Sequence, residues 1–117
     1  MTNDMLLPSP MPALTWLRAL QPSCAGAARQ CLGRIYGDND EELRRRTALI
    51  RNTLTRFLER FGDAPVRIFR APGRINLRGM HVDTHGGYLN LMTHQREVVA
   101  VMAQADPGRC VFVNTDP

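Results

Sequence analysis

A long amphipathic helix, followed by a change of periodicity at Pro65, most constrains how this chain can fold. Before that proline, apolar side chains recur at helical spacing, at Leu43, Ile50, Leu54, Phe57, Leu58 and Phe61. Asp38, Asn39 and Asp40 are candidate N-caps, and Gly62 is a candidate C-terminal stop. The pattern predicts a helix of about six turns between these caps and Gly62.

After Pro65 the side chains alternate with the period of two that is typical of strands. We expect four or so short strands, at residues 66–69, 75–77, 96–103 and 110–113. Ala71-Pro72-Gly73 is expected to break or bend the first of them, and Asp106-Pro107-Gly108 suits a type II turn. Helices followed by a small mixed sheet predict an α+β, or mixed α/β, fold.

The residues before the long helix divide into two parts. Residues 1–12 are rich in Pro and Met without a period, which is typical of a flexible tail. Residues 13–37 are expected to form a helical extension, with one helix over 13–20 and a second, capped by Ser23, that ends at Tyr36. The second helix is expected to bury Ala27, Ala28, Cys31, Leu32 and Ile35. Residues 38–117 are then the main domain.

Composition argues against several classes of protein. The hydrophobic fraction of 44% and charged fraction of 22% are those of a soluble globular chain. No apolar run is long enough to span a bilayer, and the first residues lack the basic region of a signal peptide, so we expect a cytoplasmic protein without a membrane partner. The three cysteines have unrelated spacings that predict neither a disulfide framework nor a zinc site; we expect small buried thiols at Cys24, Cys31 and Cys110.

The net charge of +4 comes from fifteen basic residues, all of them arginine. Clustered arginines would suit nucleic-acid binding, but these are scattered from Arg18 to Arg109. The triplet 44–46 lies beside Glu41 and Glu42 and is interpreted as a solvated helix face. With few aromatic side chains to stack on bases, no nucleic-acid partner is expected.

Side chains that could bind a ligand or take part in catalysis are concentrated in residues 70–87, which read RAPGRINLRGMHVDTHGG. These eighteen residues hold four glycines, three arginines, two histidines and one aspartate. The Arg74 guanidinium presents a fork of donors that suits a phosphate or a carboxylate. The carboxylate of Asp83 and the imidazole of His81 could hold vicinal hydroxyls. The segment therefore predicts a small-molecule site for a polyol or a phosphate.

The same residues allow other interpretations. A glycine-rich stretch can be a tight connection between strands, in which His81 and Asp83 satisfy backbone groups near a turn. His81, Asp83 and His85 share a spacing that could hold a metal, but with no cysteine nearby and no paired carboxylate no metal is expected. His85 and His94 are interpreted as structural.

The segment resembles the galactokinase signature of the GHMP small-molecule kinase superfamily. The likeness rests on Arg70-Ala71-Pro72-Gly73-Arg74-Ile75-Asn76-Leu77 followed by Gly79, His81, Asp83, Gly86 and Gly87. Residues 57–66 look like the end of the family's leading helix and its first strand, and residues 96–116 are similar to the hairpin that follows the signature. The resemblance covers about residues 38–117 and implies part of a GHMP-kinase N-terminal domain.

The resemblance implies transfer of a phosphoryl group from ATP, with Mg²⁺, to a sugar hydroxyl. The family arginine that matches Arg74 lies beside the phosphoryl-transfer centre, which implies a catalytic role for Arg74. Phosphoryl transfer depends on positioning and electrostatic stabilisation, and a guanidinium can contribute to both. The implied sugar-binding residues are Gly79, Met80, His81, Asp83, Gly86 and Gly87.

The chain departs from the galactokinase pattern at two places. Where galactokinases carry Gly-Glu-His-Thr-Asp-Tyr, residues 79–84 read GMHVDT, so that Met80 replaces a glutamate that accepts a sugar hydroxyl. Asn90-Leu91 replaces a Leu-Pro pair. An apolar side chain rejects the wrong epimer less strongly than a hydroxyl acceptor does. The pattern therefore looks like a divergent bacterial branch whose substrate is a sugar that the sequence does not specify.

Family members run to several hundred residues, and their phosphate loop and catalytic aspartate follow the signature. No similar segment is seen in this sequence. We therefore expect an N-terminal sugar-binding portion of a kinase of galactose metabolism or a related pathway, inactive alone, with the missing C-terminal part as its partner. Two alternative hypotheses are a non-catalytic relic that binds a sugar or a partner, and a nucleic-acid-binding or regulatory protein, which only the arginine content favours.

Overall fold

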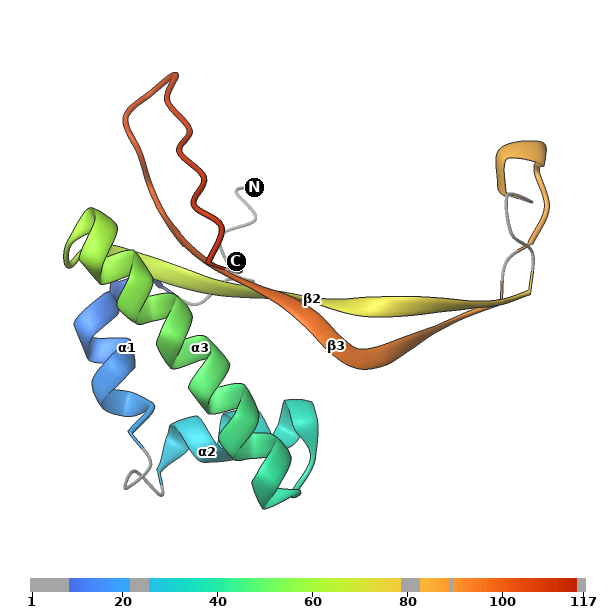
Figure 1. Ribbon diagram of the computed structural model, residues 1–117, viewed down its shortest axis with the longest axis horizontal. Helices are drawn as coiled ribbons and strands as arrows, with labels where there is room; N and C mark the ends of the chain where they lie inside the picture. The colour runs from blue at the N-terminus through green and yellow to red at the C-terminus, as the bar shows by residue number, and fades with distance from the viewer. Residues whose placement is uncertain (1–8, 22–25, 79–82, 89, 116–117) are drawn as a thin grey trace. The chain divides into compact units, whose positions relative to one another are not determined.

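A computed structural model of the chain describes residues 9–21, 26–78, 83–88 and 90–115 (Figure 1). In chain order the elements are β1 (Met11–Pro12), α1 (Ala13–Ala19), α2 (Ala27–Tyr36), α3 (Asp40–Phe61), β2 (Pro65–Arg78), the 3-10 helix η1 (Asp83–His85) and β3 (Asn90–Ala103). Helices dominate the first half and strands the second, so the predicted α+β class is confirmed. The chain divides into two compact units, Met1–Ile68 with Val101–Pro117, and Phe69–Ala100.

The first unit is organised around α3. The Asn39 side chain caps the helix, because its Oδ1 accepts a hydrogen bond from the Glu42 backbone N–H at 3.0 Å. At the other end Gly62 has a φ of 77°, a left-handed conformation that glycine adopts without strain. The predicted helix, its cap and its stop are thus confirmed.

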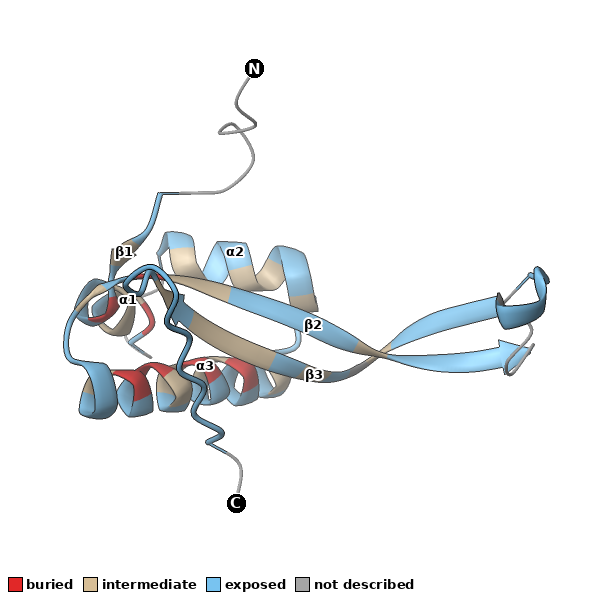
Figure 2. Cartoon of the chain, turned by 90° about the horizontal axis from the view of Figure 1, so that it is seen from above, coloured by how far each residue is buried: buried red, intermediate tan, exposed pale blue. Residues whose placement is uncertain are grey.

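The buried apolar side chains of the described residues all belong to the first unit (Figure 2). They are Ala13, Leu20, Leu43, Ile50, Leu54, Phe57 and Val66. The residues from α3 form most of the stripe that its sequence predicted, although Phe61 at the end of the stripe is 43% exposed. Burying such a stripe is the main source of helix stability in a protein.

The N-terminal segment is attached to the start of β2. The described residues at 11–12, expected in a flexible tail, instead form β1 and pair antiparallel with residues 65–66. Beyond this pairing, the Ala13 N–H donates to the Ala64 carbonyl at 3.1 Å. The Trp16 indole N–H donates to the Val66 carbonyl at 3.4 Å, and Arg51 of α3 donates to the Leu17 carbonyl at 2.8 Å. These hydrogen bonds join α1 both to the start of β2 and to α3.

The second helix differs from its prediction. It begins after Gly26 at Ala27; the expected cap, Ser23, lies outside the described residues. None of its residues is buried, so the expected buried face (Ala27, Ala28, Cys31, Leu32, Ile35) is wrong, with Ile35 45% exposed. α2 contacts α3 through the Arg29–Asp40 ion pair and through the Tyr36 ring, over which Arg46 lies, and these contacts leave its apolar residues at least partly exposed. Cys31 and Cys110 are also exposed, contrary to the expectation of buried thiols, and Cys24 lies outside the described residues.

The described strands form a sheet in the order β1-β2-β3. Contrary to the expected break at Ala71-Pro72-Gly73, β2 runs unbroken from residue 65 to 78, and β3 begins at residue 90 instead of 96. Because β1 pairs only with residues 65–66, the remainder of β2 has one open edge among the described residues. A proline is tolerated at an open edge, since its missing N–H breaks no ladder there.

The segment after β3 contains the predicted turn but not the predicted strand. The Arg109 N–H donates to the Asp106 carbonyl at 3.1 Å, and Gly108 has a φ of 80°, as a type II turn requires. Residues 110–113 are not a strand, and Phe112 is 87% exposed. No described strand pairs with them, and without a ladder the apolar alternation alone does not form a strand. Among the described residues, no helix has the length and apolarity needed to cross a membrane.

Candidate functional site

The predicted site lies within the second unit, Phe69–Ala100. Arg74 is an exposed residue of β2. Gly86 and Gly87 are exposed and follow η1, and Gly86 has a φ of 77° that a residue with a side chain would rarely adopt. Asp83 begins η1, but its side chain lies outside the described part of the structure. Gly79, Met80 and His81 lie wholly outside the described residues.

Two contacts fix how β2 and β3 face each other. The Arg70 Nε donates to Glu97 Oε2 at 2.9 Å, and only 2% of the Glu97 side chain is exposed. Three residues further along β2, Gly73 lies against the His94 imidazole. As the residue number rises by three on one strand it falls by three on the other. The two strands are therefore antiparallel, with one register across both contacts.

The alternation of an unbroken strand divides β2 into two faces. Residues 70, 74, 76 and 78 lie on the face that carries the Arg70–Glu97 pair, and we call Arg70, Arg74, Asn76 and Arg78 the arginine face. The opposite face carries Gly73 and, from β3, His94. That face is mainly apolar: besides Arg96 it carries the exposed side chains Phe69, Ile75, Leu77, Met92 and Val98. Arg74 thus shares its face with the polar side chains of β2, and the register that joins Arg70 to Glu97 puts exposed Leu91 of β3 on this face as well.

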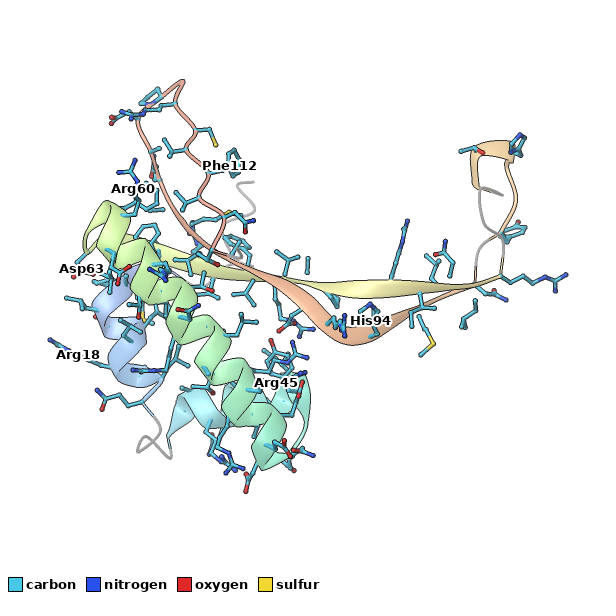
Figure 3. All side chains as sticks on the ribbon, in the orientation of Figure 1. Arg18, Arg45, Arg60, Asp63, His94 and Phe112 are labelled. Atoms are coloured by element: carbon cyan, nitrogen blue, oxygen red, sulfur yellow. The ribbon has the colours of Figure 1, made fainter. Side chains whose placement is uncertain are left out.

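His94 of β3 lies on the strand pair, with its ring against Gly73 of β2 (Figure 3). Its Nδ1 accepts a hydrogen bond from the Arg96 backbone N–H at 3.0 Å. An imidazole nitrogen accepts a hydrogen bond through its lone pair, so in this contact Nδ1 is the acceptor and the Arg96 backbone N–H is the donor. Because His94 lies on the apolar face and bonds to backbone, its structural interpretation agrees with the geometry.

The charges on the arginine face are not equivalent. Glu97 neutralises Arg70. Arg74 and Arg78 are exposed, and neither forms an ion pair within the described part of the chain. An unpaired guanidinium has five N–H donors and no acceptor, so it binds phosphate or carboxylate oxygens by charge-assisted hydrogen bonds. In the same described part, no group of His, Cys, Asp and Glu side chains has the arrangement of a metal site.

Sequence reasoning missed two features of this site, the Arg70–Glu97 pair and the contact between Gly73 and His94. The residues of each pair lie more than twenty positions apart, and their partnership depends on the register of the strands. A signal did exist in the period of two, because Arg70, Arg74, Asn76 and Arg78 all occupy even positions. The expected bend at residues 71–73 concealed it, since a bend would interrupt the alternation.

Comparison with known proteins shows which family this strand pair and its signature resemble. Residues 55–104 match the family described as the galactokinase galactose-binding signature. The match extends from the last turns of α3 through β2 and η1 to the end of β3. The chain thus carries the galactokinase signature, and the resemblance predicted from its residues is confirmed.

Individual galactokinases are similar to part of the chain. The chain is 49% identical over 39 residues to a galactokinase of Clostridium perfringens, a segment that is 32% of this chain and 10% of that protein. It is 36% identical over 53 residues to a galactokinase of Streptomyces coelicolor, which is 45% of this chain and 14% of that protein. The match therefore spans a small fraction of either relative. No solved structure matches the chain.

Proposed function

We propose that this chain is the sugar-binding portion of a galactokinase-like kinase, which transfers a phosphoryl group from ATP to a sugar hydroxyl. The galactose-binding signature at residues 55–104 is the observation that carries the proposal. The exposed, unpaired guanidinium of Arg74 supports it, because a donor fork is suited to the charge that develops on a transferring phosphoryl group. Arg74 is proposed to act at that centre.

The sugar is proposed to bind at the end of the strand pair where the signature continues into η1. Asp83 and His81 are proposed to hold its hydroxyls, with Gly79, Met80, Gly86 and Gly87 as the surrounding wall. The left-handed backbone at Gly86 supports this, since such a turn without a side chain allows a ligand to approach the main chain. A carboxylate, which only accepts hydrogen bonds, and an imidazole, which can both donate and accept them, together suit vicinal hydroxyls.

The described residues fit only part of what an ATP-dependent reaction requires. Arg74 can contact a phosphoryl oxygen, but the described part of the chain offers no carboxylate cluster for Mg²⁺. ATP and Mg²⁺ are therefore proposed for the whole enzyme, and this chain alone is proposed to bind sugar without turning over ATP. Its proposed partners are a small-molecule sugar and the remainder of the kinase, and its proposed location is the cytoplasm.

The experiment is an NMR titration of the purified 117-residue chain with galactose, alongside an assay for sugar-dependent ADP formation. We expect saturable shifts around residues 83–88 with a Kd on the order of millimolar, and no ADP. Asp83→Ala should abolish the saturable shifts. The matched control is Asp106→Ala, which removes the same charge from an exposed turn and should leave the Kd unchanged. Absence of saturable shifts with galactose, and with the charged hexoses galacturonate and galactose 6-phosphate, would refute the sugar-binding role.

A further inference from the structure

The arginine face carries more positive charge than a single catalytic guanidinium would explain. Arg70 is matched by Glu97, but Arg78 is a second exposed arginine that, like Arg74, has no ion-pair partner among the described residues. Clustered unpaired cations repel one another. A face that retains them is suited to an anion that is absent from the protein itself.

The spacing of these residues allows them to act on one group. Arg74, Asn76 and Arg78 occupy successive positions on the same face of β2, and each step of two residues advances about 7 Å along a strand. An anion above Asn76 is therefore within one step of both arginines. The register that joins Arg70 to Glu97 places Thr93 of β3, also exposed, opposite Arg74. The asparagine amide and the threonine hydroxyl add neutral donors.

The chemistry of the donors indicates what they bind. Guanidinium groups offer only donors, whereas a neutral sugar hydroxyl needs both a donor and an acceptor for full pairing. A phosphate or a carboxylate is an acceptor for every one of those N–H groups, and its charge strengthens each bond. Two arginines on either side of an amide donor therefore match an oxyanion better than they match an uncharged hexose.

We propose that Arg74, Asn76 and Arg78 form a subsite for an anionic group carried by the sugar, so that the substrate class is a sugar phosphate or a sugar acid. The inference rests on the proposed sugar-binding function and deepens it. The anion binds at these side chains, and the sugar ring extends toward the proposed hydroxyl-binding residues of the signature.

The test compares four probes on the purified chain by NMR titration: galactose, galacturonate, galactose 6-phosphate and inorganic phosphate. One of the two charged hexoses should bind at least about tenfold more tightly than galactose, which is the order expected of one charge-assisted pair. It should also bind more tightly than inorganic phosphate, because the ring contributes contacts of its own. The preference should fall as salt rises, since exposed charges are screened.

Paired variants locate the preference. Arg78→Gln should lower the ratio of charged-hexose affinity to galactose affinity by about tenfold. Arg96→Gln is the control, because it removes the same charge from the apolar face of the same strand pair and should leave that ratio unchanged. Equal loss in both variants would mean that net charge alone is responsible and would overturn the subsite.

The remaining outcomes separate this inference from the proposed function. If galactose binds and neither charged hexose binds better, the subsite is wrong and the sugar-binding role stands. If inorganic phosphate binds as tightly as the charged hexose, the arginines form an anion site that is not part of a sugar site, and the inference is again wrong. If none of the three sugars binds, both proposals fail together.

Discussion

Gly73 determines how closely β2 and β3 approach each other beside the proposed site. A Cβ atom at this position would collide with the His94 ring and lie 2.9 Å from the Arg96 carbonyl oxygen. The ring can move, but the carbonyl belongs to the backbone of β3. The glycine of the signature therefore has a packing role in addition to any role in binding.

We expect Gly73→Ala to destabilise the strand pair by about 1–3 kcal/mol, the usual cost of overpacking. The measurement is a urea titration followed by the NMR signals of β2 and β3. Gly33→Ala is the control, since a Cβ there would lie 3.5 Å from Asp38 Oδ1, an ordinary contact, in the interior of α2. That change should be neutral or stabilising by up to about 1 kcal/mol. If the Gly73→Ala chain were as stable as the wild type, the backbone of β3 would have shifted to accommodate the added methyl group, and the prediction would be wrong.

At the scale of elements, the first turns of α3 join α2 through a buried charge. Arg46 is only 4% exposed. Its Nε donates to Glu42 Oε1 at 2.6 Å, and its guanidinium lies 5.2 Å from the centre of the Tyr36 ring at the end of α2. The Arg46 hydrogen bond, supported by a second one from Arg45, holds the pKa of Glu42 below its usual value. Arg46 is thus not part of the solvated face predicted for residues 44–46.

This pair should make stability depend on pH. A carboxylate whose pKa is lower in the folded chain stabilises the fold above its unfolded pKa, and that contribution is lost as the pH falls through the folded value. We therefore expect the urea midpoint of unfolding of the wild-type chain to decrease as the pH is lowered below about 4.5. Glu42→Gln should make this decrease smaller. Glu41→Gln is the control, because Glu41 shares the first turn of α3 but is exposed. An equal reduction of this decrease by both changes would assign the effect to the helix dipole instead of the ion pair.

The difference between local sequence signals and contacts between elements explains how far the fold could be predicted from the sequence. Helix α3 was predicted with its cap and its stop because Asn39, Gly62 and the apolar stripe are local signals. The unbroken strand β2 was not predicted, because Pro72 and Gly73 are typical of a break in a strand. Their place in β2 depends on the open edge of the sheet and on the His94 ring of β3, which the local sequence does not indicate. Burial of Arg46 likewise depends on Tyr36 of another element. Interactions between elements are difficult to predict from the local sequence pattern.

The candidate site shows the same division between local signals and contacts between elements. Arg74 was predicted from its residue type and its glycine-rich surroundings; the structure places it on an exposed strand face, and its role stays a prediction. Its neighbours on that face, Asn76 and Arg78, were not predicted, since their grouping requires β2 to continue through Pro72. The matched signature at residues 55–104 spans the second unit completely and part of the first.

At the scale of the whole molecule, the two units differ in what stabilises them. The buried apolar side chains of the described residues lie in the first unit, whereas the second exposes Leu77 to 62% and Val98 to 70%. Separating β2 from β3 beyond residue 69 would therefore expose little additional apolar surface. Since burial of apolar surface is the dominant stabilising term, this strand pair should open far more readily than α3.

Hydrogen exchange measured by NMR tests this difference. After correction for intrinsic rates, we expect backbone amides in the centre of α3, around the fully buried Leu54, to exchange at least ~100-fold more slowly than ladder amides around His94. Amides at residues 110–113, which form no strand, provide the unprotected reference. Because the strand pair opens without the first unit, Leu54→Ala should accelerate exchange in α3 and leave exchange around His94 unchanged. Equal protection in both regions, or equal acceleration by that substitution, would show that the two units unfold as one.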